Sequence, residues 1–240
     1  MRRYKRVLVI TGAVALMLGL LWTGGLFAPF YHVPVTQGPS TERAIALTFD
    51  DGPTPSTLGV LDTLAKYGVK ATFFEVGVNV TRHPDISRQV IASGSEVGLH
   101  SYSHSYWLPF QFPWQSVRDI ERGRDAVVAT IGKDPLIFRA PHGKTSLWMR
   151  WGLQRHGTKA VGWDVQATDW QQRPGQEIAA DVVRQLHPGA IILLHDGLDT
   201  ADAPDRSAML AALPMIIEQA QAQGYRFKTV AELLGVQAYR

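Results

Sequence analysis

The sequence predicts an α/β protein built as a distorted, incomplete (β/α) barrel. Short β-rich runs alternate with helix-length segments over residues 44 to 230, and chemically capable side chains follow directly after five of these runs. Alternating strands and helices indicate parallel βα units. In a barrel, all parallel strand ends meet on one face, whereas an open doubly wound sheet spreads them along an edge. We therefore expect the barrel, with its active site at the carboxyl ends of the strands.

The order of the predicted elements follows from these runs. The first strand covers residues 44–49 and precedes a helix for which Ser56 is the expected N-cap and Gly68 the expected end. The later strands are expected at residues 70–76, 95–99, 135–139, 158–165, 190–195 and 225–230, with helical candidates between them. One domain is expected, because 240 residues with 45% hydrophobic composition can bury one substantial core.

The N-terminus predicts a membrane anchor. Residues 7–28 form an uncharged stretch of 22 residues, which as a helix is about 33 Å long and crosses a bilayer core. The alternative is a cleaved secretory signal, but no good small-x-small cleavage site is present. We expect a cytoplasmic basic tip at residues 1–6, a signal anchor at 7–28, a linker at 29–41 and an extracytoplasmic catalytic domain at 42–240.

Charge and cysteine content exclude several classes of protein. The formal net charge is +3, but four of the 24 basic residues lie in the N-terminal tip, so the body is close to neutral. It gives no electrostatic case for binding nucleic acid, and no protein partner is implied. The chain has no cysteine, so the exported domain does without disulfides and without thiolate chemistry.

Two carboxylates stand side by side in TFDDGP, where Asp50 and Asp51 follow the first apolar run. Adjacent anions at a buried strand end need solvent, a cation or a metal to compensate their charge. The segment HSYSH adds His100 and His104, which point the same way if they lie on one helical turn. Two histidines and one carboxylate can hold a divalent metal and leave positions open for water and substrate. We therefore expect a metal, with either acid as its third ligand.

The acid that does not bind metal can serve as a general base for a water that the metal activates. Arg139 of RAPHG ends a predicted strand, where it can hold an ionised aspartate. His195 of LLHD is a candidate general acid, especially if Asp169 of TDW accepts its other ring N–H and raises the pKa of the imidazole. The structural alternatives are a surface arginine and a packed core histidine.

The loop SYWLPFQFPW at residues 105–114 is rich in aromatic side chains: Tyr106, Trp107, Phe110, Phe112 and Trp114. Aromatic rings on a loop that faces the site can stack on sugar rings. Five rings so close together can equally cap the barrel or meet the membrane. The sequence leaves these alternatives open.

Taken together, the motifs TFDDGP, HSYSH, RAPHG, DVQATDW and LLHD, in this order over residues 42–235, resemble the polysaccharide deacetylase (NodB-homology) family. The resemblance implies a distorted (β/α) barrel that binds zinc or another divalent ion, with cobalt, nickel and manganese as alternatives. It also implies a metal-dependent carbohydrate esterase that removes acetyl groups from N-acetylated sugars, or from O-acetylated sugars in some members.

By motif position, the resemblance assigns a role to each candidate residue. Asp50 corresponds to the base, Arg139 to the residue that orients it, His195 to the acid and Asp169 to the partner of the acid. The metal set corresponds to Asp51, His100 and His104, and the substrate-binding set to His142, Trp170 and Leu193. In the fourth motif Gln166 stands where the family commonly has aspartate, and we expect this difference to affect substrate preference more than activity.

These inferences predict a membrane-anchored hydrolase of carbon–nitrogen bonds that deacetylates N-acetylglucosamine in a cell-surface glycan, with peptidoglycan as the leading substrate. The rivals within the enzyme class are a deacetylase of chitin oligosaccharides or exopolysaccharide and an O-acetyl esterase. A membrane-tethered glycan-binding module without activity is the rival from another class. If the signal is cleaved, the domain is secreted instead.

Overall fold

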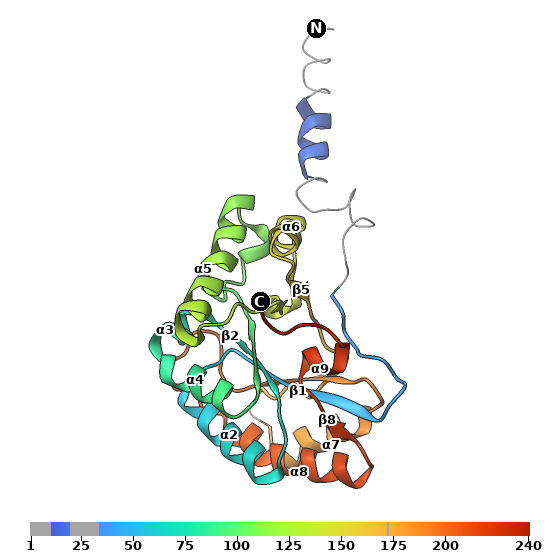
Figure 1. Ribbon diagram of the computed structural model, residues 1–240. Coiled ribbons are helices and arrows are strands. Elements are labelled where there is room, and N and C mark those ends of the chain that lie inside the picture. The colour runs from blue at the N-terminus through green and yellow to red at the C-terminus, as the bar shows by residue number, and fades with distance from the viewer. Residues whose placement is uncertain (1–10, 20–33, 172) are drawn as a thin grey trace, which may run out of the picture.

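A curled sheet of parallel strands, covered on its outer face by helices, forms the body of the protein (Figure 1). The computed structural model describes residues 11–19, 34–171 and 173–240. Seven strands follow the order β5-β4-β3-β2-β1-β7-β6, and β8 pairs with the beginning of β1. The strands are β1 (Ala44–Asp50), β2 (Thr72–Glu75), β3 (Glu96–Leu99), β4 (Ile137–Phe138), β5 (Lys159–Ala160), β6 (Val165–Gln166), β7 (Ile191–His195) and β8 (Arg226–Phe227). The predicted incomplete barrel is confirmed.

Helices follow most of the strands, and a side chain caps the beginning of three of them, α2, α6 and α9. Helix α2 starts after Thr54, whose side chain caps it, so the prediction that Ser56 is the N-cap is wrong by two residues. Gly68 ends this helix in the left-handed conformation, as predicted. The helices are α2 (Pro55–Tyr67), α3 (Gly77–Arg82), α4 (Pro84–Ala92), α5 (Pro113–Ile131), α6 (Leu147–Arg155), α7 (Gly175–Gln185), α8 (Ser207–Ala222) and α9 (Val230–Leu234), with short 3-10 turns η2 (Leu108–Phe110) and η3 (Pro141–Gly143).

The barrel is open between β5 and β6, the two ends of the sheet. The sequence predicts one strand over residues 158–165, but the chain leaves β5 and crosses the opening before it forms β6 on the other side. Residues near the N-terminus bridge part of this opening, since Val35 pairs with Val161 and Gln37 with Ala190. Residues 34–41, which the sequence assigns to a linker, therefore lie against the body.

Apolar side chains form one layer on each face of the sheet. The larger lies between the strands and the helices, where Phe49 stacks on Phe73. The smaller fills the barrel interior and includes Phe74 and Ile191 from the strands and Val230 from α9. Because α9 covers the amino-terminal end of the barrel and its Val230 N–H donates to Thr72 Oγ1, the site must form at the opposite, carboxyl end.

The predicted tip and most of the predicted anchor lie outside the described residues. Residues 11–19 are helical. Among the residues that the structure describes, no helix has both the length and the apolar character needed to cross a membrane.

Candidate active site

A hollow of about 400 Å³ lies at the carboxyl ends of the strands. Eight of the residues singled out in the sequence line it: Asp50, Asp51, His100, His104, His142, Trp170, Leu193 and His195. The other two, Arg139 and Asp169, lie behind this wall and contact Asp50 and His195. Segments that are as much as 145 residues apart are thus brought together because their strands end on one face.

Asp51, His100 and His104 form a compact cluster that suits a divalent metal. One ligand atom from each lies within 4.8 Å of the others. Asp51 Oδ1 is buried and accepts no hydrogen bond, and it lies 3.4 Å from His100 Nε2 and 2.9 Å from His104 Nε2. A buried carboxylate oxygen without a hydrogen bond is costly unless a cation contacts it. Two imidazoles and one carboxylate are a donor set for zinc, cobalt or nickel, so these residues fit a metal.

The outer nitrogen of each histidine faces an oxygen. His100 Nδ1 lies 2.8 Å from the backbone oxygen of Arg139, and His104 Nδ1 lies 2.8 Å from Asp199 Oδ1. Oxygens at these positions favour a proton on Nδ1, which leaves the Nε2 lone pairs directed at Asp51. The backbone N–H of Asp199 also donates to Asp51 Oδ2 at 3.0 Å. Asp199 therefore contacts two of the three residues in the cluster.

The charges of the cluster shift its pKa values in opposite directions. Burial favours the neutral acid at Asp51, but the adjacent His100 and His104 outweigh burial and hold the pKa of Asp51 well below its ordinary value. Burial opposes a charge on His104, yet Asp199 and Asp51 raise its pKa to about 10. Without metal, a proton therefore takes the place of the cation, and a metal must displace it to bind.

Turns, rather than a helix, bring the two histidines together. The spacing of His100 and His104 would let them point the same way on one helical turn, but residues 100–105 form no helix. Their rings meet at a centroid distance of 5.0 Å because Ser101 and His104 adopt positive φ angles of 64° and 53°. Asp51 also has positive φ, at 73°. Such backbone is strained for residues other than glycine and is concentrated at functional sites.

Asp50 and Arg139 form a buried ion pair beside the cluster. Arg139 Nη1 donates to Asp50 Oδ1 at 2.8 Å and to Thr48 Oγ1 at 2.6 Å, and Nη2 donates to the backbone oxygen of Gly162 at 2.8 Å. The guanidinium also lies 4.2 Å from the centre of the Phe74 ring. The surface alternative for Arg139 is wrong, because this side chain is fully buried. Arg139 holds Oδ1 of Asp50, and the Asp50 side chain lines the wall of the hollow.

His195 and Asp169 face each other on the opposite wall. Asp169 Oδ1 lies 2.9 Å from His195 Nδ1, and Asp169 Oδ2 accepts the backbone N–H of His195 at 2.8 Å. Burial lowers the pKa of His195, but the charge of Asp169 and its hydrogen bond outweigh burial, with smaller contributions from Asp51 and Asp50, and the pKa rises to about 9. A cation at Asp51 would offset part of this rise. At neutral pH the imidazole is protonated and can donate from Nε2.

The remaining predicted residues form the sides of the hollow. The Trp170 ring lies edge-on to His195, with 5.2 Å between ring centroids, and Leu193 is buried below it. The His142 ring packs edge-on against His104 at 4.6 Å. Burial and the charge of His104 lower the pKa of His142, which keeps it neutral beside the cluster.

The sequence did not indicate three residues of the hollow, namely Trp163, Leu198 and Asp199. Trp163 donates from Nε1 to Oε1 of Gln166 at 3.0 Å, so the departure from the family motif positions a wall of the site. Asp199 lies four residues after His195 in an acidic loop, and this proximity in sequence is the signal that could have identified it.

Replacing Asp199 by asparagine is expected to weaken metal binding about tenfold, because the outer carboxylate at Nδ1 of His104 is lost while the backbone contact to Asp51 stays. Asparagine tolerates the positive φ of 49° at this position. Equilibrium dialysis against zinc measures the effect. The matched control is Asp202→Asn. Asp202 lies in the same loop as Asp199, and its carboxylate contacts His83 rather than the cluster. Equal affinities of the two variants would show that Asp199 does not support the cluster.

Comparison with known proteins identifies the chain with one family. The model of the polysaccharide deacetylase family matches residues 37–161. The chain is 38% identical over 199 residues to a peptidoglycan-N-acetylglucosamine deacetylase of Bacillus cereus, which covers 82% of this chain and 90% of the relative. It is 34% identical over 222 residues to a chitooligosaccharide deacetylase of Bradyrhizobium sp., which covers 86% of this chain and 98% of the relative.

A solved structure supports the same assignment. The Bc1960 peptidoglycan N-acetylglucosamine deacetylase superposes with a TM-score of 0.81 at 28% identity, and the match covers 91% of this chain and all of that chain. The family model, the similarity over most of the chain and the shared fold agree with the resemblance inferred from the five motifs. The chain belongs to the polysaccharide deacetylase family of hydrolases.

Proposed function

We propose that the protein is a metal-dependent deacetylase anchored in the cell membrane, and that it hydrolyses the N-acetyl group of N-acetylglucosamine in peptidoglycan. The observation that carries the proposal is one hollow lined by a metal-type cluster, an aspartate held by a buried arginine and a histidine paired with a buried aspartate. Peptidoglycan is chosen because relatives that match most of this chain include deacetylases of that glycan. The uncharged stretch at residues 7–28 supports the anchor and the extracytoplasmic location.

The proposed chemistry divides the work among the residues of the hollow. A divalent ion held by Asp51, His100 and His104 would act as a Lewis acid on the acetyl carbonyl and make water more acidic. Asp50, oriented by Arg139, accepts the proton of the attacking water. His195 donates a proton to the amide nitrogen, because an amine anion does not leave. The products are acetate and a free amino sugar.

The walls of the hollow favour a small acyl group next to a sugar. Trp170 and Leu193 give an apolar surface beside His195, and we assign it to the acetyl methyl group. Trp163 and His142 border the hollow on another side, where a ring can stack on a sugar face. Gln166, which holds Trp163, is where we expect this chain to differ from its relatives in substrate preference.

The decisive test measures acetate release by the zinc-loaded protein from peptidoglycan, chitin oligomers and O-acetylated xylan. We expect the highest rate with peptidoglycan. A higher rate with chitin oligomers would move the assignment to that substrate, and release from the ester alone would make the protein an esterase. No release with zinc, cobalt, nickel or manganese would favour the inactive glycan-binding module.

The pH dependence of the reaction tests the assignment of the acid. Rates should fall as the pH rises through the pKa of His195, because only the protonated imidazole can donate. Asp169→Asn removes the charge that raises this pKa, so the alkaline limb of the kcat profile should move to lower pH. The free energy of unfolding should also fall as the pH rises. The contribution of the His195–Asp169 pair is complete below the ordinary histidine pKa and is lost as the pH rises towards 9. An unmoved limb in Asp169→Asn would exclude His195 as the acid.

A further inference from the structure

Six exposed aromatic side chains gather at one end of the body and are not part of the hollow. We call them the aromatic patch: Tyr106, Trp107, Phe110, Phe112, Trp114 and Trp151. Each is between 46% and 66% exposed. Five of the rings touch another ring in two groups, Tyr106 with Trp107 and Phe110, and Phe112 with Trp114. Because exposed apolar side chains in contiguous patches mark interaction surfaces, this patch needs an occupant.

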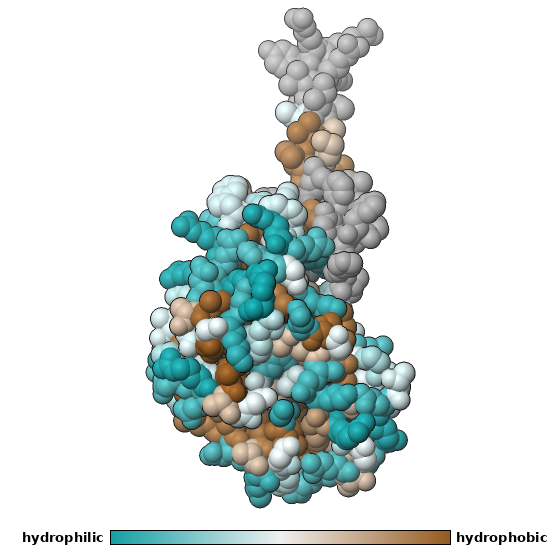
Figure 2. Space-filling model, viewed as in Figure 1, coloured by the Kyte–Doolittle hydropathy of each residue, from teal (hydrophilic) through white to brown (hydrophobic). Residues whose placement is uncertain are grey.

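The patch spans the loop before α5 and the adjoining helix α6. The α6 residue Gly152 packs on Val117 of α5, so α6, which carries Trp151, lies against the helix that follows the loop. In Figure 1 the start of α5 and α6 lie together at the upper end of the body. Tryptophan and tyrosine are nearly neutral on the hydropathy scale, and in Figure 2 this end shows pale residues and some brown among teal ones.

A basic stretch of the chain that contains no acid adjoins the patch, although Glu121 of α5 lies 3.6 Å from His156 at the end of α6. From residue 135 to residue 163 the chain has no aspartate or glutamate. Four cations of this stretch have no carboxylate within 4.0 Å among the residues that the structure describes: Lys144, Arg150, Arg155 and Lys159. Two of them lie over rings of the patch, Lys144 at 3.5 Å from the centre of Tyr106 and Arg155 at 4.8 Å from that of Trp151. The surface thus suits a partner that is anionic at its surface and apolar beneath.

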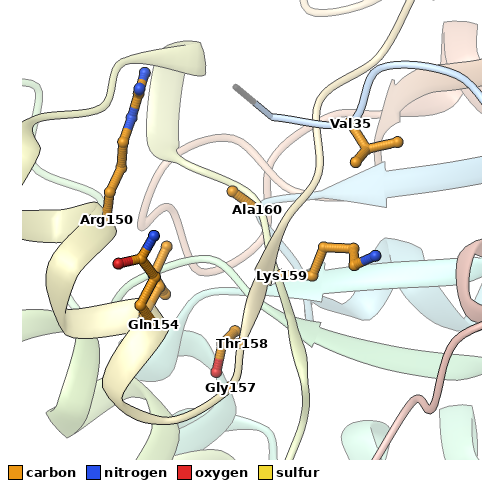
Figure 3. A pocket seen from close by; sticks show the side chains of 8 residues that line it. Val35, Arg150, Gln154, Gly157, Thr158, Lys159 and Ala160 are labelled. Carbon is orange, nitrogen blue, oxygen red and sulfur yellow. The ribbon is translucent and has the colours of Figure 1, made fainter. Parts of the chain in front are cut away.

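The described body begins at this same end. Val35 and Arg150 border one hollow of about 360 Å³ between α6 and β5, and Figure 3 shows Val35 and Ala160 across it from Gln154 of α6. Pro34 borders a second hollow together with Thr145 and His142. The chain therefore enters the body beside α6, next to two of the cations, Arg150 and Lys159.

The length of the chain outside the body restricts what can cover this face. Five residues, 29–33, separate the uncharged stretch 7–28 from Pro34. At most about 3.6 Å per residue, they span no more than roughly 18 Å. If the uncharged stretch crosses a bilayer, the face that contains Pro34 must lie close to the surface of that bilayer.

We infer that the aromatic patch and its four cations dock on an anionic lipid surface. Tryptophan and tyrosine favour the headgroup region, and lysine and arginine beside them bind anionic lipid headgroups. Because Tyr106 contacts His142 with 5.3 Å between ring centroids, docking fixes the rim of the active-site hollow beside the bilayer. The enzyme would then act on glycan that lies close to the membrane. This inference rests on the proposed anchor.

The test uses the full chain in vesicles and exploits the lack of cysteine, so that a single introduced thiol can be labelled. Gln111→Cys places a fluorophore within the patch loop, and Gln176→Cys places it on α7 at the other end of the body. Brominated lipids quench a fluorophore that touches the bilayer. In vesicles with phosphatidylglycerol, we expect quenching at position 111 to exceed that at position 176 at least about twofold.

The difference in quenching between positions 111 and 176 should disappear when either kind of contact is removed. The double variant Trp107→Ser with Trp114→Ser removes the apolar contact. Adding 0.5 M salt, or using vesicles of phosphatidylcholine alone, weakens the attraction of the cations. The double variant should keep its rate on soluble chitin oligomers, since neither tryptophan lines the active-site hollow.

The outcomes separate the docking surface from the anchor. Flotation with vesicles in 1 M salt tests the anchor alone, and a chain that fails to float overturns both inferences. A chain that floats but shows equal quenching at positions 111 and 176 keeps its anchor and loses the docking surface. If chitin oligomers change the emission at position 111 while brominated lipid does not, the patch binds glycan and the inference is wrong.

Discussion

Replacing Asp50 by asparagine is expected to lower kcat/KM for acetate release by about 10²- to 10⁴-fold while metal affinity stays as in the wild type. Asparagine has the size of aspartate and still accepts a hydrogen bond from Arg139, but it cannot accept a proton from water. The carboxylate of Asp50 is held through Oδ1 by Arg139, whereas that of Asp51 faces the two histidines. Acetate release and equilibrium dialysis against zinc measure the two effects.

The variant Asp51→Asn is the matched partner of this experiment. It should lose metal affinity, because it removes the charged oxygen that lies between His100 and His104. Asp62→Asn, at an exposed position of α2, controls for the loss of a carboxylate and should leave both quantities unchanged. Loss of metal in Asp50→Asn together with its retention in Asp51→Asn would mean that the two acids have exchanged roles.

Replacing Arg139 by methionine is expected to lower the free energy of unfolding by about 3–5 kcal/mol, because it leaves the buried charge of Asp50 without its partner. Arg139 is completely buried and donates to three oxygens, of Asp50, Thr48 and Gly162. Methionine keeps most of the apolar volume against Phe74, so the loss reports the ion pair and its hydrogen bonds rather than a cavity. Chemical denaturation of the full chain in detergent, with chelator present, measures it.

A double-mutant cycle separates the charge from the packing. In Asp50→Asn with Arg139→Met no charge is left unpaired, so the double variant should lose less than the sum of the single variants. The surface control is Arg226→Met, which removes an exposed pair with Glu42 and should change the free energy of unfolding by less than about 1 kcal/mol. A change equally small in Arg139→Met would show that Arg139 does not compensate a buried charge.

The sequence predicts the barrel well because the strands and helices differ in their apolar patterns. It fails at the opening of the barrel, where residues 158–165 look like one strand. Val161 and Val165 suit a strand equally well, and only the curling of the sheet in three dimensions places them on opposite sides of the opening. The pairing of Val35 with Val161 was likewise hidden, because the prolines and lack of charge in residues 29–41 suggest a linker.

The candidate residues were predictable for a related reason. Aspartate, histidine and arginine directly after apolar runs are unusual, and strand ends converge in a barrel. His100 and His104 were found with the wrong local geometry, because spacing alone cannot distinguish a helical turn from a turn with positive φ. Asp199 has only its proximity to His195 as a signal, because its contacts with His104 and Asp51 join distant segments, and Trp163 belongs to no motif of its own.

By itself, the sequence determined the alternation of strands and helices, the chemical groups at the strand ends and the family that their motifs identify. These features are local, because apolar periodicity and motif spacing are written in neighbouring residues. Only the tertiary structure decided where the barrel opens, which acid faces the histidines and which carboxylate supports His104. It also placed α6, which carries Trp151 of the aromatic patch, beside the point where the chain enters the body. Such contacts depend on strand pairing between segments more than one hundred residues apart, as between β1 and β7.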